Sequence, residues 1–377
     1  MTARKLTVVQ VLPALQSGGV ERGTLEVGKH LVDHGHRSIV LSAGGRLVDR
    51  LLREGSEHVG WNIGCKNPWT FRLVPLLRRF LIENKVDILH ARSRMPAWIC
   101  YLAWKGMDPA TRPRFITTVH GLYSVNAYSA VMIKGERIIA VSEAAMDYIV
   151  RSYPHVERER IELIPRGVEP AEFPYGFKPS AEWLEAWQAE FPQLAGKKIL
   201  SLPARITRLK GHHEFIELIA QLRARNMNVH GLIVGAEDPN RKGYAAEIRQ
   251  TVNDRGLGGD ISFTGGRLDI REIYSISDIV FSLSTKPESF GRTVLEALCL
   301  GVPVVAYSHG GVSEIMRALY PAGMVEPENM PELIGTVARL LETPAQVSPD
   351  NPYTLKNMLD RTLALYEQAA ASRKLSG

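Results

Sequence analysis

The chain has 377 residues, of which 45% are hydrophobic and 23% are charged, a globular composition long enough for two α/β domains. No apolar run approaches the ~20 residues of a membrane-spanning helix, and three cysteines without metal-binding spacing indicate a reducing compartment, so we expect a cytoplasmic protein. The net charge of +6 arises in the first 165 residues and, without a nucleic-acid-binding motif, favours a membrane surface or a phosphorylated acceptor over nucleic acid.

Two glycines follow the first predicted strand. Strand Val8–Leu12 leads through Gly18 and Gly19 into a helix over residues 20–34. Paired glycines at a strand-to-helix turn let the backbone approach a ligand closely. Taken alone, the pair is explained equally well by a tight turn or by a binding loop.

The segment 70–84 predicts a helix that is both apolar and basic. Its large and charged side chains, with the tryptophan that precedes it, are Trp69, Phe71, Arg72, Arg78, Arg79 and Phe80. Such a stripe either meets a membrane surface or combines a core face with a solvated basic face. The sequence leaves both interpretations open.

Polar side chains follow the next strands, at the edge where parallel α/β sheets bind ligands. Strand 86–90 is followed by Arg92 and Arg94, which suit an acceptor phosphate or carboxylate, although ion pairs within the domain would explain them equally well. Strand 115–119 places His120 at the same edge.

Aromatic and amide side chains come after that histidine. Tyr123 and Asn126 lie in a polar and aromatic stretch that suits a sugar acceptor. Further along, Ser142 precedes a predicted helix and is expected to cap it.

A proline-rich stretch divides the chain. Residues 169–180 lose all hydrophobic periodicity, which predicts a linker between a domain over residues 1–168 and a second over residues 181–354. Arg166 lies just before this stretch, where it would suit a charged acceptor.

A basic pair opens the second domain. After strand 198–202, Arg205 and Lys210 stand between a strand end and a helix, where a guanidinium fork and a point charge can neutralise a pyrophosphate. The alternative interpretation is that they are two solvated basic residues on a loop without a ligand.

Two carboxylates mark a strand–loop–helix–strand unit over residues 278–315. Glu288 lies in the loop and Glu296 in an apolar helix, where an unpaired buried carboxylate would be costly. Glu296 therefore either faces solvent or accepts hydrogen bonds from a ligand diol.

This unit carries a resemblance to a known family. Glu288-Ser289-Phe290-Gly291, followed by Glu296-Ala297 and Gly301–Ala306, resembles the E-x7-E signature of retaining, nucleotide-sugar-dependent glycosyltransferases of family 4. The resemblance covers essentially the whole chain. It implies an α/β GT-B fold, in which two Rossmann-like domains face a central cleft and a C-terminal helix, residues 355–377, crosses back onto the first domain.

The resemblance also implies roles for individual residues. The residues implied to bind the donor are Gly18, Gly19, Arg205, Lys210, Gly235, Arg267, Glu288, Ser289, Phe290, Gly291 and Glu296. Those with an implied catalytic role are His120, Glu288, Arg205 and Lys210. Those expected to bind the acceptor are Arg92, Arg94, Tyr123, Asn126 and Arg166. The family usually has Asn-Gly where this chain has Arg166-Gly167, which leaves the role of that position open.

The expected activity is hexosyl transfer from a nucleotide diphosphate sugar, with UDP favoured because it is common in the family. The sequence contains no Asp-x-Asp pair, so we expect neither a metal nor another cofactor. Lipopolysaccharide core is the favoured acceptor, with peripheral contact to an anionic inner membrane. The alternatives are a nucleotide-sugar epimerase of the same fold and a non-catalytic scaffold that has kept the fold.

Overall fold

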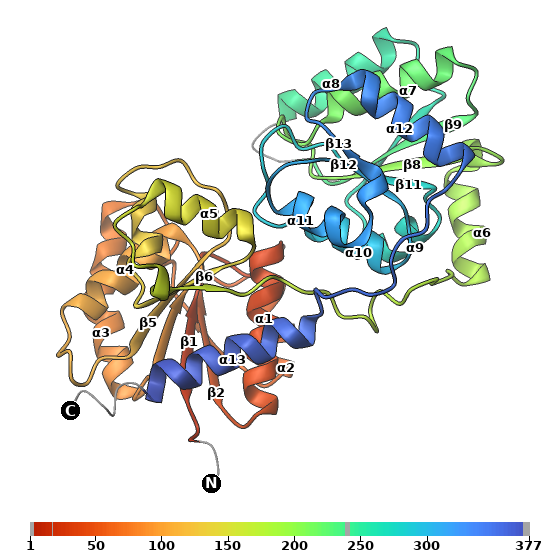
Figure 1. Ribbon diagram of the computed structural model, residues 1–377. Helices are drawn as coiled ribbons and strands as arrows, with labels where there is room; N and C mark the ends of the chain where they lie inside the picture. Colours follow the sequence, from red (N-terminus) through yellow and green to blue (C-terminus); the bar gives the residue numbers. More distant parts are fainter. Residues whose placement is uncertain (1–3, 17, 238–241, 372–377) are drawn as a thin grey trace. The chain divides into compact units, whose positions relative to one another are not determined.

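The computed structural model describes residues 4–16, 18–237 and 242–371 (Figure 1). Within these residues the chain forms two compact units. Unit 1 contains the residues up to Arg166 and those from Lys356 onward, and unit 2 contains Gly167–Leu355.

Unit 1 is built on a parallel sheet of seven strands in the order β3-β2-β1-β4-β5-β6-β7. Its strands are β1 Thr7–Val11, β2 Arg37–Ser42, β3 Glu57–Gly60, β4 Ile88–Ala91, β5 Arg114–Val119, β6 Arg137–Ala140 and β7 Ile161–Leu163. In β1, Val9 pairs with Ile39 on one side and Leu89 on the other, and all three are fully buried. The strand order reverses between β1 and β4, which is where such sheets bind ligands.

Helices connect these strands, as parallel pairing requires. They are α1 Gly19–Asp33, α2 Val48–Arg53, η1 Pro68–Arg72, α3 Leu73–Glu83, α4 Arg94–Lys105, η2 Ser129–Ile133, α5 Glu143–Ser152 and η3 Arg158–Arg160. The predicted cap of α5 is confirmed, because the Ser142 hydroxyl accepts from the Ala145 N–H at 2.9 Å.

The helix predicted over residues 70–84 is in fact two elements. The tight turn η1 precedes α3, since the Asn67 side chain accepts from the Trp69 N–H at 3.0 Å and Pro68 follows it with a preset φ. The helical prediction is therefore correct for α3 but wrong for the first residues of the range.

Unit 2 is built on a second parallel sheet, in the order β10-β9-β8-β11-β12-β13. Its strands are β8 Lys198–Pro203, β9 Val229–Val234, β10 Ile261–Gly265, β11 Ile279–Ser282, β12 Val304–Tyr307 and β13 Met324–Val325. Its helices are α6 Ala181–Glu190, η4 Pro192–Leu194, α7 His212–Ala224, α8 Lys242–Asp254, α9 Ile270–Ser275, α10 Arg292–Cys299, α11 Gly310–Leu319, η5 Pro321–Gly323 and α12 Met330–Glu342. The strand order reverses between β8 and β11.

The residues predicted as a linker belong to unit 2 and pack on the rest of it. Phe173 is buried, and the Gly176 N–H donates to the Leu300 carbonyl at 2.9 Å. The two stretches that connect the units also pair with each other, since the Val168 N–H donates to the Tyr353 carbonyl and the Leu355 N–H to the Val168 carbonyl.

Helix α13, Leu355–Ala371, packs on unit 1, as predicted for the last helix. Its Tyr366 is fully buried and its hydroxyl lies 2.6 Å from His90 Nδ1, while the Ala369 carbonyl accepts from Arg114 at 3.2 Å. Residues 372–377 of the predicted helix lie outside the described residues. Two Rossmann-like units and this returning helix confirm the predicted GT-B fold.

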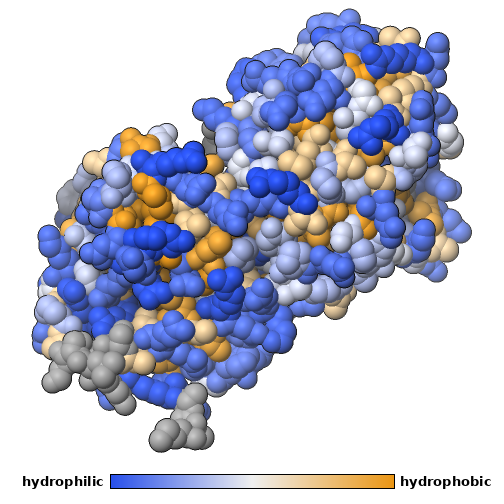
Figure 2. All heavy atoms as spheres, in the orientation of Figure 1, coloured by the Kyte–Doolittle hydropathy of each residue, from blue (hydrophilic) through white to orange (hydrophobic). Residues whose placement is uncertain are grey.

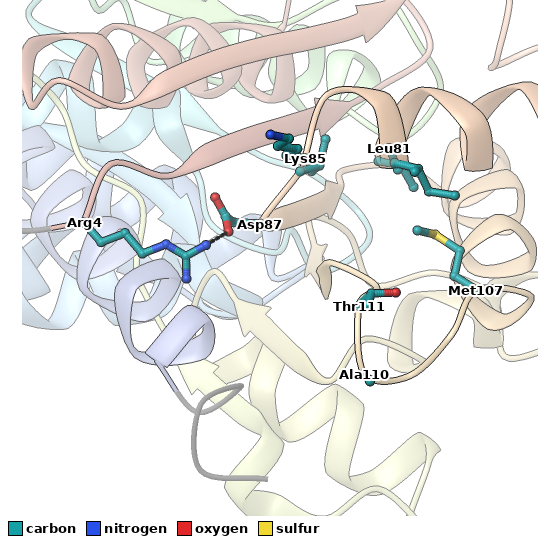
Figure 3. A pocket seen from close by; sticks show the side chains of 9 residues that line it. Arg4, Leu81, Lys85, Asp87, Met107, Ala110 and Thr111 are labelled. Carbon is teal, nitrogen blue, oxygen red and sulfur yellow. Dashed lines mark hydrogen bonds and ion pairs between the residues drawn. The ribbon is translucent and has the colours of Figure 1, made fainter. Parts of the chain in front are cut away.

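Unit 1 also contains a cavity of about 500 Å³ at the amino ends of its strands (Figure 3). Leu81 and Lys85, from the end of α3 and the turn after it, line the cavity together with Met107 and Thr111, and an ion pair joins Arg4 to Asp87 at its margin. This edge of the sheet is opposite the ligand-binding edge.

The visible surface is mostly hydrophilic, with hydrophobic patches between the polar side chains (Figure 2). Among the described residues, no helix combines the length and the apolar character needed to cross a membrane.

Candidate active site

An ion pair lies at the switch point of the unit 2 sheet. Lys210 follows β8 and Glu288 follows β11, and the Lys210 Nζ lies 2.6 Å from Glu288 Oε1. The Ser284 hydroxyl also donates to Glu288, and the Ser284 carbonyl lies 2.8 Å from His309 Nε2. The structure thus brings together two residues predicted to be catalytic, and it adds Ser284 and His309, which the sequence did not identify.

The charge of Glu288 depends on these neighbours. Burial alone raises the pKa of its carboxyl, but the Lys210 ammonium and the Ser284 hydroxyl outweigh burial, so the pKa lies below its usual value. Glu288 is therefore a carboxylate at neutral pH, able to accept hydrogen bonds from sugar hydroxyls.

Glycines allow the backbone to come close at this point. Gly211 has φ +75°, and a Cβ there would lie 2.1 Å from the Leu283 carbonyl oxygen. Gly310 and Gly311 lie equally close to the backbone of Glu288 and Ser289, and the Gly311 N–H donates to the Glu288 carbonyl at 2.8 Å. The paired glycines of the His309-Gly310-Gly311 turn are visible in the sequence, but only the fold shows that they pack on the loop that carries Glu288.

Glu296 is buried, with 5% of its surface exposed, so the alternative that it faces solvent is wrong. Arg292 Nε donates to its Oε1 at 2.9 Å, and the Tyr274 hydroxyl lies 3.5 Å from its Oε2. The predicted contact of Glu296 with a ligand diol stays a prediction.

Phe290, also predicted to bind the donor, is buried against Tyr353. Gly291 begins α10 with φ +105°.

The other predicted donor residues of unit 2 differ in their surroundings. Arg205 is exposed and makes no hydrogen bond or ion pair among the described residues, so its charge is available to an anion. Gly235 follows β9, and a Cβ there would lie 1.9 Å from the Ala204 carbonyl oxygen. Arg267 instead has two protein partners, Asp269 at 2.7 Å and Glu190 at 2.9 Å, which raise its pKa.

Unit 1 holds a second polar group at its own switch point. Arg166 donates to the Gly19 carbonyl at the start of α1, and its Nη2 lies 2.6 Å from His120 Nδ1. Gly18, the N-cap of α1, has φ +141°. The structure therefore brings together Gly19, His120 and Arg166, which the sequence placed in separate roles.

Arg92 is buried behind this group. Burial lowers the pKa of its guanidinium, and Tyr366 and Glu26 partly offset that effect. Arg92, His90, His120 and Arg166 line a cavity of about 30 Å³, which has room for about one water molecule. Arg92 lines this pocket and also interacts with the Glu26 carboxylate of the same unit, so an acceptor contact and an ion pair within the domain both stay open for it.

Arg94 lies with aromatic side chains instead. Its guanidinium lies 4.7 Å from the ring centre of Tyr123 and 5.3 Å from that of Tyr128, and its Nη1 lies 3.3 Å from the Ser129 hydroxyl. The exposed Asn126 accepts from the Ser129 N–H at 2.8 Å, so it organises the turn that presents these rings. These residues form a polar and aromatic surface suited to a sugar.

No group of three or more His, Cys, Asp or Glu side chains that could hold a metal ion occurs among the described residues. The positive charge of the candidate site in unit 2 comes from Lys210 and Arg205, and the N-terminus of α7 directly follows Lys210.

Comparison with known proteins identifies the family. The model for Glycosyltransferase Family 4 matches residues 17–172, and the model for Glycosyl transferases group 1 matches residues 185–352. A glycosyltransferase of known crystal structure from Rickettsia africae ESF-5 is 31% identical, over 97% of this chain and 98% of that chain, with a TM-score of 0.85. Anabaena HepE in complex with UDP-glucose has the same fold at 19% identity, over 99% of this chain and all of that chain, with a TM-score of 0.76.

One curated relative is named as a lipopolysaccharide transferase. Lipopolysaccharide 1,2-N-acetylglucosaminetransferase of Salmonella typhimurium is 29% identical over 148 residues, 38% of this chain and 39% of the relative. The chain spans half or less of the length of several curated relatives that it matches. The two family models and the Rickettsia relative show that the chain belongs to the glycosyltransferases of the family 4 and group 1 type, with the GT-B fold.

Proposed function

We propose that this glycosyltransferase transfers a hexosyl group from a nucleotide diphosphate sugar to a cell-envelope glycan, with retention of anomeric configuration and without a metal ion. The observation that carries the proposal is the Lys210–Glu288 pair at the switch point of unit 2, beside the exposed Arg205. A cation that neutralises a leaving diphosphate and a carboxylate that holds sugar hydroxyls are the two groups that this chemistry requires.

In this proposal Lys210 and Arg205 stabilise the charge that develops on the diphosphate as the glycosidic bond breaks. The positive end of α7 adds to that stabilisation. Glu288, Ser289, Phe290 and Gly291 hold the donor sugar, Glu296 binds the ribose hydroxyls, and the leaving phosphate helps to deprotonate the acceptor on the same face.

UDP is the proposed nucleotide, which the shared fold with HepE in complex with UDP-glucose supports. The proposed acceptor is lipopolysaccharide core, supported by the Salmonella relative. Arg94, Tyr123 and Asn126 would form its binding surface, since a guanidinium stacked on aromatic rings suits both sugars and anions.

We also infer that unit 1 contacts the cytoplasmic face of an anionic membrane. Of the ten large hydrophobic side chains exposed among the described residues, four lie on η1 and α3. Together with two arginines they form what we call the α3 surface: Trp69, Phe71, Arg72, Leu76, Arg79 and Ile82. The Arg72 guanidinium lies 3.8 Å from the Trp69 ring centre. Ile82 is also one of the residues that line the cavity at the amino ends of the unit 1 strands. Apolar side chains with interspersed arginines complement anionic lipid.

Vesicle binding tests this contact. The full chain should sediment with vesicles of phosphatidylglycerol and phosphatidylcholine and much less with phosphatidylcholine alone. Trp69→Ala with Leu76→Ala should reduce sedimentation several-fold, whereas Leu268→Ala, which removes the 93% exposed leucine of unit 2, should not. Equal sedimentation of all variants would show that the α3 surface is not the contact.

Titration calorimetry with UDP, GDP and ADP, with and without EDTA, tests the donor site. One nucleotide should bind, unchanged by EDTA, and Lys210→Ala should abolish the binding. Lys198→Ala is the matched control, because Lys198 begins β8 and forms an exposed pair with Asp278 away from the site. If no nucleotide binds, or if EDTA removes the binding, the metal-free donor site is wrong.

Product analysis separates the two alternatives. Formation of an epimerised sugar from the nucleotide sugar without an acceptor, and not its simple hydrolysis, would favour an epimerase. Acceptor binding without nucleotide binding would favour a scaffold.

A further inference from the structure

Arg166 forms a specific contact with His120 in unit 1. The Nη2 atom of Arg166 lies 2.6 Å from His120 Nδ1. The same guanidinium also donates to the Gly19 carbonyl. It therefore joins the ends of three strands, since Gly19 follows β1, His120 follows β5 and Arg166 follows β7.

This contact determines where the imidazole proton lies. A guanidinium has five N–H donors and no acceptor, so His120 Nδ1 must accept the hydrogen bond. A nitrogen that accepts carries no proton, and the single proton of a neutral imidazole then lies on Nε2. Asparagine at position 166 would impose no such choice, because its amide both donates and accepts.

The other groups around His120 also disfavour its protonated form. Burial has the largest effect and lowers its pKa well below the usual value, and Arg166, Arg92 and His90 lower it further. All three are basic groups. His90 is itself buried, between the Tyr366 hydroxyl at 2.6 Å and the Thr118 hydroxyl at 2.7 Å.

We infer that Arg166 is a positioning residue, which holds His120 as the neutral tautomer protonated on Nε2, so that His120 donates a hydrogen bond to a substrate oxygen and does not transfer a proton. The use of this donor in glycosyl transfer rests on the proposed function. The tautomer does not, because it follows from the contact with Arg166. With asparagine at position 166, the same histidine could take either tautomer.

Nitrogen NMR of the histidine-labelled full chain tests the inference directly. Two-bond ¹⁵N–¹H spectra distinguish a protonated from an unprotonated ring nitrogen, and loss of signals in His120→Gln assigns His120 among the 11 histidines. The wild type should show an unprotonated Nδ1 and a protonated Nε2, without change between about pH 8 and about pH 5.5. In Arg166→Asn both nitrogens should move toward the averaged shifts of a tautomer mixture.

Arg166→Lys is the second variant, because an ammonium also only donates and should preserve the Nε2–H tautomer. A protonated Nδ1 in the wild type, or titration of His120 near pH 6.5, would overturn the inference, as would an unchanged tautomer in Arg166→Asn. These results do not depend on whether a nucleotide sugar binds, so they are distinguishable from a failure of the proposed function.

Two substitutions of His120 test its role with UDP-glucose hydrolysis as the assay. The glutamine amide reaches the position of Nε2, and the asparagine amide reaches that of Nδ1. His120→Gln should therefore lose about 10-fold in kcat/KM or less, and His120→Asn about 100-fold or more. Equal losses of about 100-fold or more would instead indicate proton transfer by the histidine.

Discussion

Glu288 shows how the charge of a side chain in the candidate site depends on its immediate neighbours. Without Lys210 and Ser284, burial would favour the protonated form of the Glu288 carboxyl. Because the folded state lowers the pKa of Glu288 below the reference value of 4.5, the ionised carboxylate stabilises unit 2 above that pH. This contribution is lost as the pH falls through the lower pKa of the folded state.

Glu288→Gln should therefore destabilise unit 2 at pH 7, by about 1 kcal/mol, and the difference from wild type should shrink as the pH falls below about 4.5. Urea unfolding at a series of pH values measures this. Glu57→Gln, at the exposed Arg37 pair of unit 1, should have a smaller effect. A difference that stays constant from neutral to acid pH would contradict the assignment.

Tyr366 connects α13 to the polar group of unit 1. Its hydroxyl is buried against His90, and Tyr366→Phe should cost about 1–3 kcal/mol in the stability of unit 1 because His90 loses a buried partner. Tyr101→Phe is the matched control. The described residues give the Tyr101 hydroxyl no hydrogen bond, so that variant should stay within about 0.5 kcal/mol of wild type in thermal unfolding.

Tight turns between strands and helices shape both candidate sites, and they account for what the sequence could predict. The alternation of apolar strands and helices, and the glycines at their junctions, predicted the order of elements and the βαβ unit around Glu288 and Glu296. The side-chain pairings could not be read in this way. His120 and Arg166 are 46 residues apart, and Arg267 has Glu190 as a partner only because the end of α6 packs near that turn.

Gly211 offers a matched test of these turns. Gly211 and Gly196 both have φ near +70°. A Cβ at Gly211 would overlap the Leu283 backbone, whereas a Cβ at Gly196 would have no neighbouring atom within 4 Å. Gly196→Ala should cost about 1 kcal/mol for the left-handed conformation alone.

Gly211→Ala should cost more, about 2 kcal/mol or above, and should weaken nucleotide binding because Leu283 leads into the loop that carries Glu288. Urea unfolding and calorimetry measure the two effects. Equal stability of both alanine variants would mean that the close approach to Leu283 does not affect the free energy of unfolding.

The whole molecule consists of one continuous and one discontinuous unit. Unit 2 is a single stretch, Gly167–Leu355, with its own sheet and core. We expect residues 167–355 to unfold cooperatively when expressed alone, and to bind the same nucleotide as the full chain within about 10-fold in Kd, because Lys210, Arg205 and Glu288 all lie within them.

Unit 1 should behave differently. Residues 1–166 alone should be poorly folded because α13 is missing, and joining Arg166 to Lys356 through a short linker should restore folding, since Val168 and Thr354 are bridged. Circular dichroism and thermal unfolding compare the two forms. Cooperative unfolding of residues 1–166 without α13 would show that the helix is dispensable.

The burial of Tyr366 against β4 also constrains the order of events on the ribosome. Synthesis runs from the N-terminus, so unit 2 can complete its core while the partner of the first sheet, α13, has not yet been translated. The newly made part of unit 1 therefore leaves exposed the apolar surface that α13 will cover. That surface stays exposed until nearly two hundred further residues have been synthesised. Chaperone dependence and sensitivity to premature termination should accordingly concentrate in the half of the protein that is made first.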